Sequence, residues 1–204
     1  MSKYKIAVVG FGNVGREVFN AIEESPDMET AGIVIRNPQK MQAVKRIVGD
    51  VPVTTDVREL GKVDVAILSI ASRSVPEVAP KFLELGINTV DSFDIHGDEI
   101  IRLRQKLDSI AKAHNAVAVI SAGWDPGSDS IVRALVEVVA PRGLTYTNFG
   151  PGMSMGHTVA VKAIEGVEDA LSMTIPQGNG LHKRMVYVKA KEGYDFDKIA
   201  EAIK

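Results

Sequence analysis

Short apolar runs alternate with amphipathic segments over residues 1–123. Several runs are apolar at almost every position, which is typical of strands that are covered on both faces of a sheet. The segments between them carry apolar side chains at helical spacing. Because parallel strands need crossover connections, this alternation predicts an α/β fold built on a doubly wound parallel sheet. The predicted strands are residues 5–9, 30–35, 51–55, 63–70, 87–92 and 116–121.

Two of the predicted helices carry clear apolar stripes. In residues 13–24 the stripe consists of Val14, Val18, Ala21 and Ile22. In residues 98–114 it consists of Ile101, Leu103, Leu107 and Ile110, with charged side chains on the other side. We expect both stripes to pack against the sheet.

The pattern changes after "APRG" at residues 140–143. The predicted elements there are a strand at 144–150, a helix at 156–164, an antiparallel strand pair at 169–176 and 184–190 around the turn "QGNG", and a final helix capped by Asp195. Two or three strands make only a marginal sheet. We therefore predict a second, smaller α+β domain that is incomplete.

Composition narrows the classes of function. The chain has 204 residues, 45% of them hydrophobic and 25% charged, with a net charge of −2. It has no basic block, which argues against a nucleic acid or an anionic membrane as partner. It has no cysteine, which excludes disulfides, thiolate metal sites and cysteine nucleophiles, and we expect no metal site. The N-terminus lacks an apolar leader and no run is long enough to span a bilayer, so we expect a cytoplasmic protein.

The segment "VVGFGNVGRE" has G-x-G-x-x-G spacing between the first strand and the first helix. Gly10 allows the tight turn, Gly12 lets the backbone approach a pyrophosphate, and Gly15 lets helix and strand pack closely. The helix N-terminus adds backbone donors and a positive dipole. A glycine-rich turn without a ligand is the alternative. We predict a Rossmann dinucleotide-binding domain, with a loop that holds the cofactor through Gly10, Phe11, Gly12, Asn13, Val14 and Gly15.

The end of the second strand indicates which dinucleotide is bound. Proteins of this fold that prefer NAD usually place an acidic residue there to accept from the ribose 2′-hydroxyl. This chain reads "GIVIRNP", with Arg36 and Asn37 at that point. A guanidinium suits a 2′-phosphate through forked, charge-assisted hydrogen bonds. We predict NADP rather than NAD, with a solvated loop arginine as the alternative.

Three further loops are expected at the same edge of the sheet. In "SIASRSVPE", small residues would let the backbone pass close to the nicotinamide ribose, or Ser74 would cap the helix that contains Pro76. "TVDSFDIH" and "SAGWDPG" bring Asp94, Trp124 and Asp125 towards the nicotinamide; Asp125 would alternatively cap the helix that follows Pro126. The added cofactor contacts are Ser69, Ala71, Ser72, Ser92, Phe93 and Asp94.

Through nearly its whole length the chain resembles the meso-diaminopimelate dehydrogenases. The matching segments are "VGFGNVGR", "APKFLELGINTVDSFDIH", "ISAGWDPG", "FGPGMSMGH", "TIPQ" and "HKR". The last four are specific to that family rather than to Rossmann proteins generally. The resemblance implies NADP-dependent oxidative deamination of meso-2,6-diaminopimelate at its D-centre, giving L-2-amino-6-oxopimelate and ammonia, and the reverse reductive amination in lysine biosynthesis. It also implies a homodimer.

The resemblance assigns roles to matching residues. Asp94 and Asp125 match the carboxylates beside the reacting amino group, where a proton must leave the amine and cationic character must be stabilised. By the same match, the substrate contacts are Asp94, Trp124, Asp125, Phe149, Met155, Gly156, Thr174 and Arg184. His157 belongs to a loop that closes over substrate, or bonds to backbone at a helix start. We accordingly expect the dinucleotide-binding domain at residues 1–123 and the substrate-binding and dimerisation domain at 124–204.

The chain departs from the family pattern in two ways. Met155 and Val159 stand where members carry an amide and an acidic side chain, and we expect a pocket more tolerant of other D-amino acids. Members are also longer, by roughly a third or more, and their later segments supply a histidine and an asparagine to the substrate site. We therefore expect the Rossmann part to recognise NADP, the substrate part to be truncated, and residues 1–204 alone to fall short of full turnover.

Two other readings stay open. One is another NADP-dependent D-amino acid or imine dehydrogenase. The other is a non-catalytic dinucleotide-binding module, which would not require the cluster of Asp94, Trp124 and Asp125 at the cofactor edge.

Overall fold

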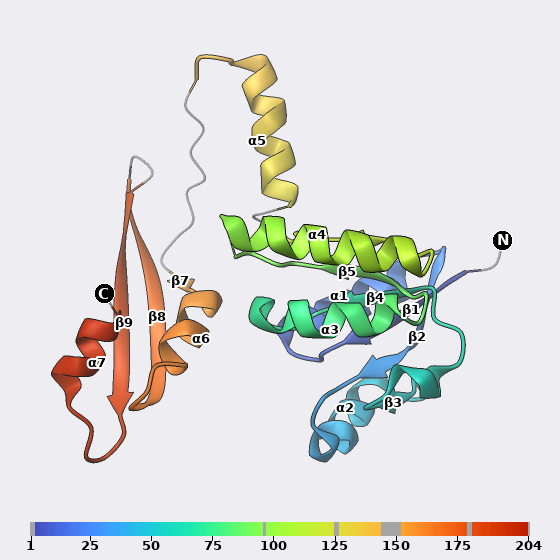
Figure 1. The fold of residues 1–204 in the computed structure, drawn as a ribbon, viewed down its shortest axis with the longest axis horizontal. Helices are drawn as coiled ribbons and strands as arrows, with labels where there is room; N and C mark the ends of the chain where they lie inside the picture. Colours follow the sequence, from blue (N-terminus) through green and yellow to red (C-terminus); the bar gives the residue numbers. More distant parts are fainter. Residues whose placement is uncertain (1–2, 96, 125–126, 144–151, 179–180, 204) are drawn as a thin grey trace. The chain divides into compact units, whose positions relative to one another are not determined.

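The computed structural model describes residues 3–95, 97–124, 127–143, 152–178 and 181–203 (Figure 1). The chain divides into two compact units, Met1–Leu135 and Val136–Lys204. The prediction that 1–123 binds dinucleotide and 124–204 binds substrate concerns function and stays a prediction. Within the described residues, no helix combines the length and the apolar character that crossing a bilayer requires.

The first unit is a parallel sheet with helices on both faces (Figure 1). Its strands are β1 Tyr4–Val9, β2 Met28–Val34, β3 Val53–Thr54, β4 Val65–Leu68, β5 Asn88–Asp91 and β6 Ala118–Val119. Its helices are α1 Asn13–Glu24, α2 Met41–Val48, α3 Val75–Leu83 and α4 Asp98–Ala113, with short 3-10 turns η1 Pro38–Lys40, η2 Val57–Leu60 and η3 Ser72–Ser74. Helix α5 Ser128–Val139 begins in this unit, and the boundary at Leu135 falls within it. The strand order β3-β2-β1-β4-β5-β6 confirms the predicted doubly wound sheet.

Both faces of the sheet are buried, as the continuous apolar runs predicted. Along β1, Ile6 and Val8 belong to a cluster with side chains of α1 and α2. Ala7 and Val9 belong to a second cluster with side chains of α3 and α4. Successive side chains of a strand point to opposite faces, so an almost wholly apolar strand belongs between two helical layers.

The predicted rotation of two helices is partly wrong. Val14 is 60% exposed and Ala21 is exposed, whereas Gly15 and Ile22 are buried. The close approach of Gly15 to the carbonyl of Gly10 sets the rotation of α1, and apolar spacing could not reveal it.

Helix α4 differs at one position of its stripe. Ile101 is 55% exposed, while Leu103, Leu107 and Ala111 are buried. The buried stripe therefore consists of Leu103, Leu107 and Ala111, at positions i, i+4 and i+8. It includes Ala111, which was not predicted, and excludes Ile101, which was.

The second unit is a three-stranded antiparallel sheet with two helices. Its elements are β7 Gly152–Met153, α6 Met155–Lys162, β8 Val167–Gly178, β9 Leu181–Ala190 and α7 Phe196–Ile203, with strand order β7-β8-β9. Its core joins Val161 of α6, Ala170 of β8 and Ile199 of α7. The predicted strand pair is confirmed, and the Asp195 carboxylate accepts from the N–H of Asp197 at 2.9 Å, as expected of a cap. The predicted strand at 144–150 lies outside the described residues.

Candidate functional site

The loops of the candidate site leave the sheet at its carboxyl edge, where parallel sheets bind ligands. Backbone hydrogen bonds order them. The N–H of Gly10 donates to the carbonyl of Val34 at 2.8 Å, and the N–H of Ser69 donates to Val9 at 2.8 Å. At the next strand pair, the N–H of Ala122 donates to the carbonyl of Asp91 at 2.7 Å.

The three glycines of the first loop serve different ends. Gly10 has φ +88°, and a side chain there would come within 2.5 Å of the carbonyl oxygen of Ser69. A side chain on Gly15 would collide with the carbonyl oxygen of Gly10. Gly12 has φ −85°, and a Cβ there would meet nothing within 4 Å. The protein's own packing therefore requires glycine at 10 and 15, while the space beside Gly12 fits the backbone approach of a ligand.

The start of α1 has the character of an anion site. Gly12 is the N-cap, and the first turn contains no acidic side chain. The first N–H groups of a helix lack intrahelical acceptors and carry the positive end of its dipole. Phe11 packs edge-on against Phe19 at 6.2 Å and lies 6.0 Å from the guanidinium of Arg16, while Asn13 is exposed. These features fit the pyrophosphate of a dinucleotide.

Ser69 lies at the crossing of the glycine loop and β4. Its hydroxyl oxygen is buried and has no hydrogen-bond partner among the described residues. Because a buried hydroxyl is seldom left without a hydrogen bond, this atom is suited to contact a ligand bound beside the glycine loop. Ala71 follows as the N-cap of η3 and offers no side-chain hydrogen bond.

Arg36 and Asn37 follow β2, as predicted, and both are exposed. The Oδ1 atom of Asn37 accepts from the N–H of Gln39 at 3.0 Å, so the amide is used to cap η1. Within the described ranges, Arg36 forms no ion pair with a carboxylate. Its guanidinium is thus available to an anion near the end of β2.

A hydrogen-bonded pair joins the loops after β4 and β5. The hydroxyl of Ser72 donates to Oδ1 of Asp94 at 2.5 Å, and the N–H of Asp94 donates back to the same hydroxyl at 3.3 Å. Ser74 is the N-cap residue of α3, as the alternative predicted, but its side chain makes no capping hydrogen bond. The loop thus presents an oriented carboxylate at the edge of the sheet.

Sequence reasoning missed Asp91, the last residue of β5. Its side chain is 2% exposed, and its Oδ1 accepts from the N–H groups of Phe93 at 2.9 Å and Ser121 at 3.3 Å. Burial raises the pKa of this carboxyl, and the two backbone hydrogen bonds oppose that rise. The signal in the sequence is an acidic residue at the end of an apolar strand.

Trp124 lies in the loop after β6 and is 56% exposed. Its carbonyl accepts from the N–H of Asp129 at 2.8 Å, at the start of α5. Gly127 has φ +142° and packs on Gly123, where any side chain would collide with backbone. Asp125 lies outside the described residues, so its catalytic role and its alternative role as a cap stay predictions.

The second unit brings two predicted substrate contacts together. Thr174 on β8 is directly opposite Arg184 on β9, so both lie on one face of the sheet. Gly152 of β7 is opposite Thr174 on its other side. The Arg184 guanidinium lies 3.4 Å from the ring nitrogen Nε2 of His182, two residues earlier on the same face. A threonine hydroxyl beside a guanidinium suits a carboxylate.

The start of α6 is attached to β8. The N–H of Ser154 donates to the carbonyl of Ser172 at 2.8 Å, and the N–H of Ser172 donates to the Thr158 hydroxyl at 3.0 Å. The Oγ of Ser154 lies 2.7 Å from Nδ1 of His157. Gly156 is exposed in the first turn, and Val159 is 42% exposed. Phe149 and the side chain of Met155 lie outside what the structure describes.

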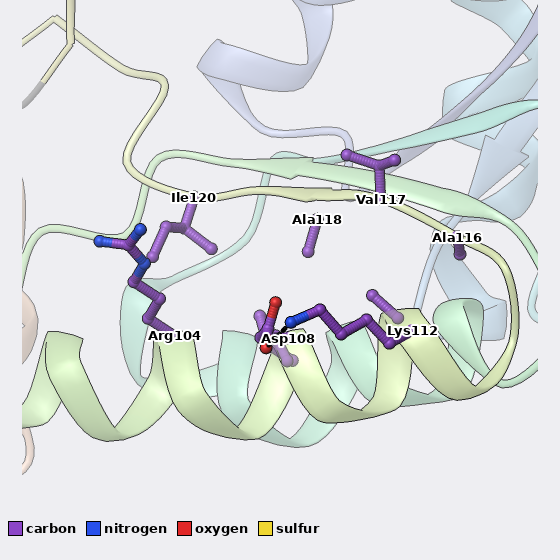
Figure 2. A pocket seen from close by; sticks show the side chains of 9 residues that line it. Arg104, Asp108, Lys112, Ala116, Val117, Ala118 and Ile120 are labelled. Atoms are coloured by element: carbon purple, nitrogen blue, oxygen red, sulfur yellow. Dashed lines mark hydrogen bonds and ion pairs between the residues drawn. The ribbon is translucent and has the colours of Figure 1, made fainter.

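A cavity of about 370 Å³ lies elsewhere in the first unit, between α4 and residues 116–120 (Figure 2). Arg104, Asp108 and Lys112 border it from the helix. It contains none of the predicted site residues. The predicted site residues therefore fall into two groups, each described within its own unit: those at the carboxyl edge of the parallel sheet in the first unit, and the Thr174–Arg184 pair in the second.

Comparison with known proteins adds to this geometry. Residues 123–182 match the family described as diaminopimelic acid dehydrogenase C-terminal domain, and residues 4–90 match the oxidoreductase family with an NAD-binding Rossmann fold. The chain is 57% identical over 204 residues to the meso-diaminopimelate D-dehydrogenase of Bacteroides fragilis and 38% identical over 224 aligned positions to that of Ureibacillus thermosphaericus. Each alignment covers the whole of this chain and 67% of the relative's length.

Solved structures of similar dehydrogenases also match this chain. The Corynebacterium glutamicum DAP dehydrogenase in complex with DAP matches with a TM-score of 0.80 and 34% identity, over 100% of this chain and 67% of that one. An engineered D-amino acid dehydrogenase bound to NADP⁺ matches with a TM-score of 0.77 and 33% identity, over 98% of this chain and 66% of that one.

Proposed function

The chain belongs to the meso-diaminopimelate D-dehydrogenase family, and from this membership we propose the reaction it catalyses. The substrate is meso-2,6-diaminopimelate, which loses the amino group of its D-centre. With NADP⁺ and water the products are L-2-amino-6-oxopimelate, ammonia, NADPH and a proton. The reverse direction is a reductive amination.

The hydrogen-bonded pair of Ser72 and Asp94 is the observation that carries the proposal. NADP, when bound, supplies the hydride acceptor. Oxidation of an amine at carbon requires loss of a proton from nitrogen and stabilisation of the developing positive charge. The carboxylate of Asp94, at the carboxyl edge of a dinucleotide-binding sheet, serves that need. The 2.5 Å hydrogen bond from the Ser72 hydroxyl holds this carboxylate in one orientation.

The pair of Thr174 and Arg184 is assigned to the other end of the substrate. Diaminopimelate has an amino acid group at each end, so an enzyme that oxidises one end must hold the other. Arg184 donates several N–H groups in one plane to a carboxylate, and Thr174 opposite it adds a hydroxyl. Trp124 is assigned to the wall of the pocket, by resemblance to the family.

The choice of NADP rests on Arg36. An exposed guanidinium at the end of β2, with no ion pair within the described part of the chain, supports a 2′-phosphate rather than a free 2′-hydroxyl. A homodimer, ammonia as product, and a cytoplasmic location complete the proposal, and they rest on the family membership.

Production of NADPH by the 204-residue chain tests the function. We expect absorbance of NADPH to rise with meso-diaminopimelate and not with the L,L isomer, because the D-centre is the one oxidised. D-Leucine is the third arm, since Val159 and Met155 favour broader use of D-amino acids. Asp94→Asn is the matched variant, because the amide keeps the shape and loses the charge.

Two results would contradict the proposal. Equal rates with the L,L isomer would exclude oxidation at a D-centre. If D-leucine were used faster than meso-diaminopimelate, the chain would be a general D-amino acid dehydrogenase instead. Emission of Trp124, the single tryptophan, gives an independent binding readout in the same samples.

A further inference from the structure

Asp91 is a buried carboxyl group that the proposed chemistry does not use. It closes β5 with 2% of its surface exposed. Among the described residues, its Oδ2 atom is buried without a hydrogen-bond partner and its carboxylate forms no ion pair. Burying a carboxyl group without a cationic partner costs free energy. An apolar residue would avoid this cost, but it would leave the N–H groups of Phe93 and Ser121 without their acceptor, so the side chain is explained by the backbone that it holds.

The contacts of Asp91 join two loops at the edge of the sheet. One oxygen, Oδ1, accepts from Phe93 at 2.9 Å in the loop after β5 and from Ser121 at 3.3 Å in the loop after β6. The backbone of Asp91 accepts from Ala122 at 2.7 Å, and the Ser121 hydroxyl donates to the Phe93 carbonyl at 2.8 Å. One of these four hydrogen bonds lies within residues 91–93, and the other three join residues 91–93 to residues 121–122.

The same contacts hold backbone that would not adopt its shape unaided. Ser121 has φ +58°, which is costly for a side chain other than glycine. Its N–H and its hydroxyl are both used in the cluster around Asp91. Phe93 is 1% exposed and anchors the other loop in the core.

Each anchored loop carries a proposed substrate contact shortly after its anchor. Asp94 follows Phe93 directly, and Trp124 lies three residues after Ser121. We propose that Asp91 is a positioning residue, which sets Asp94 and Trp124 relative to each other through its contacts with Phe93 and Ser121. This inference rests on the proposed function for what those two residues bind, and on geometry alone for how they are held.

Asp64 provides a matched control within the same sheet. Its carboxylate also accepts from a backbone N–H of a neighbouring strand, that of Lys5 at 2.8 Å. It precedes β4, so it joins strands at the amino edge of the sheet, opposite to the edge that carries Asp94 and Trp124. Asp64→Ala removes a comparable strand contact from the far side.

The test compares Asp91→Ala, Asp91→Asn and Asp64→Ala in the 204-residue chain. Acrylamide quenching and the emission maximum of Trp124 report the position of its loop without any ligand. We expect Asp91→Ala to increase quenching and shift the emission to the red. Asp91→Asn keeps one oxygen able to accept from both N–H groups, so it should restore most of the wild-type signal. Asp64→Ala should leave the signal unchanged.

Binding provides the second readout. With NADP present, we expect Asp91→Ala to weaken the affinity for meso-diaminopimelate about tenfold, while its affinity for NADP stays within about twofold. An unchanged Trp124 signal in Asp91→Ala, or an equal change in Asp64→Ala, would overturn the proposal. If Asp91→Ala fails to fold, Asp91→Ser, which keeps a short acceptor, takes its place in the same comparison.

The two proposals fail differently. If the wild-type chain does not respond to meso-diaminopimelate, the proposed function fails, while the ligand-free Trp124 comparison still decides the role of Asp91. If the wild-type chain responds and Asp91→Ala responds equally well, the positioning role is wrong and the function stands.

Discussion

Two hydrogen bonds join the Ser72 hydroxyl to Asp94: the hydroxyl donates to the carboxylate oxygen Oδ1 at 2.5 Å and accepts from the backbone N–H of Asp94 at 3.3 Å. They come from loops that follow two adjacent strands, β4 and β5. A serine that was expected to lie beside the cofactor therefore also orients the carboxylate that we propose as catalytic. Under the proposed function, one side chain would serve both cofactor binding and catalysis.

Removing that hydroxyl should damage catalysis more than folding. We expect Ser72→Ala to lower kcat/KM for meso-diaminopimelate about tenfold or more, because a hydrogen bond to a charged group contributes roughly 1.5–3 kcal/mol. Ser74→Ala is the control, since Ser74 makes no capping hydrogen bond two residues along the same segment. Similar losses in both variants would contradict a specific role for Ser72.

Two glycines of the first loop should separate ligand binding from stability. Gly12→Ala meets no protein atom within 4 Å and needs no positive φ, so thermal unfolding should change little while NADP affinity falls at least about tenfold. Gly15→Ala forces a side chain onto the Gly10 carbonyl and should cost about 1–3 kcal/mol of stability. Unfolding curves and fluorescence titration with NADPH measure both. Full NADP affinity in Gly12→Ala would contradict the pyrophosphate assignment.

Arg36 should determine which dinucleotide is preferred. We expect Arg36→Ala to weaken NADP binding about tenfold and to leave NAD binding within about twofold, because only NADP carries a 2′-phosphate for the guanidinium. Arg46→Ala, an exposed arginine on α2, is the control for loss of positive charge. Titration of both cofactors against each variant gives the ratio. Parallel losses for NADP and NAD would show that Arg36 does not read the 2′ position.

Binding of the distal carboxylate should require the planar guanidinium of Arg184 and not only its positive charge. Arg184→Lys keeps the charge but loses the planar pair of donors, and we expect KM for meso-diaminopimelate to rise about tenfold. Lys183→Ala changes the neighbouring residue, which points to the opposite face of β9, and should leave KM near its wild-type value. A normal KM in Arg184→Lys would place the distal carboxylate elsewhere.

Asp91 and Asp64 should give opposite dependences of stability on pH. Burial raises the pKa of Asp91 in the folded chain above its ordinary value of 3.8. The folded state then binds more protons than the unfolded state, so the Asp91 contribution to stability falls as pH rises from about 4 through the folded pKa. The backbone N–H of Lys5, followed by Lys62, lowers the pKa of Asp64, whose stabilising contribution is lost as pH falls through that lowered value.

Urea unfolding across a pH series checks this prediction. The difference in free energy of unfolding, wild type minus Asp91→Asn, should decrease with rising pH in the acidic range. The same difference for Asp64→Asn should increase. Equal slopes for the two pairs would show that burial does not dominate at Asp91.

Much of the fold could be predicted from local sequence patterns. Continuous apolar runs predicted strands covered on both faces, and the spacing of Gly10, Gly12 and Gly15 predicted a βα turn, because these features depend on neighbouring residues in the chain. The rotation of α1 was different. Val14 was expected inside and is exposed, because the contact between Gly15 and Gly10 decides which side of the helix meets the sheet.

By itself, the sequence determined the order of strands and helices, the glycine loop, the arginine that ends the second strand, and the family resemblance. Only the tertiary structure decided which side chains meet. It paired Ser72 with Asp94 across 22 residues and Asp91 with Ser121 across 30, and it placed Thr174 opposite Arg184. Parallel strands bring distant loops to one edge, and the register of a hairpin decides which residues face each other, so neither relation can be read from local spacing.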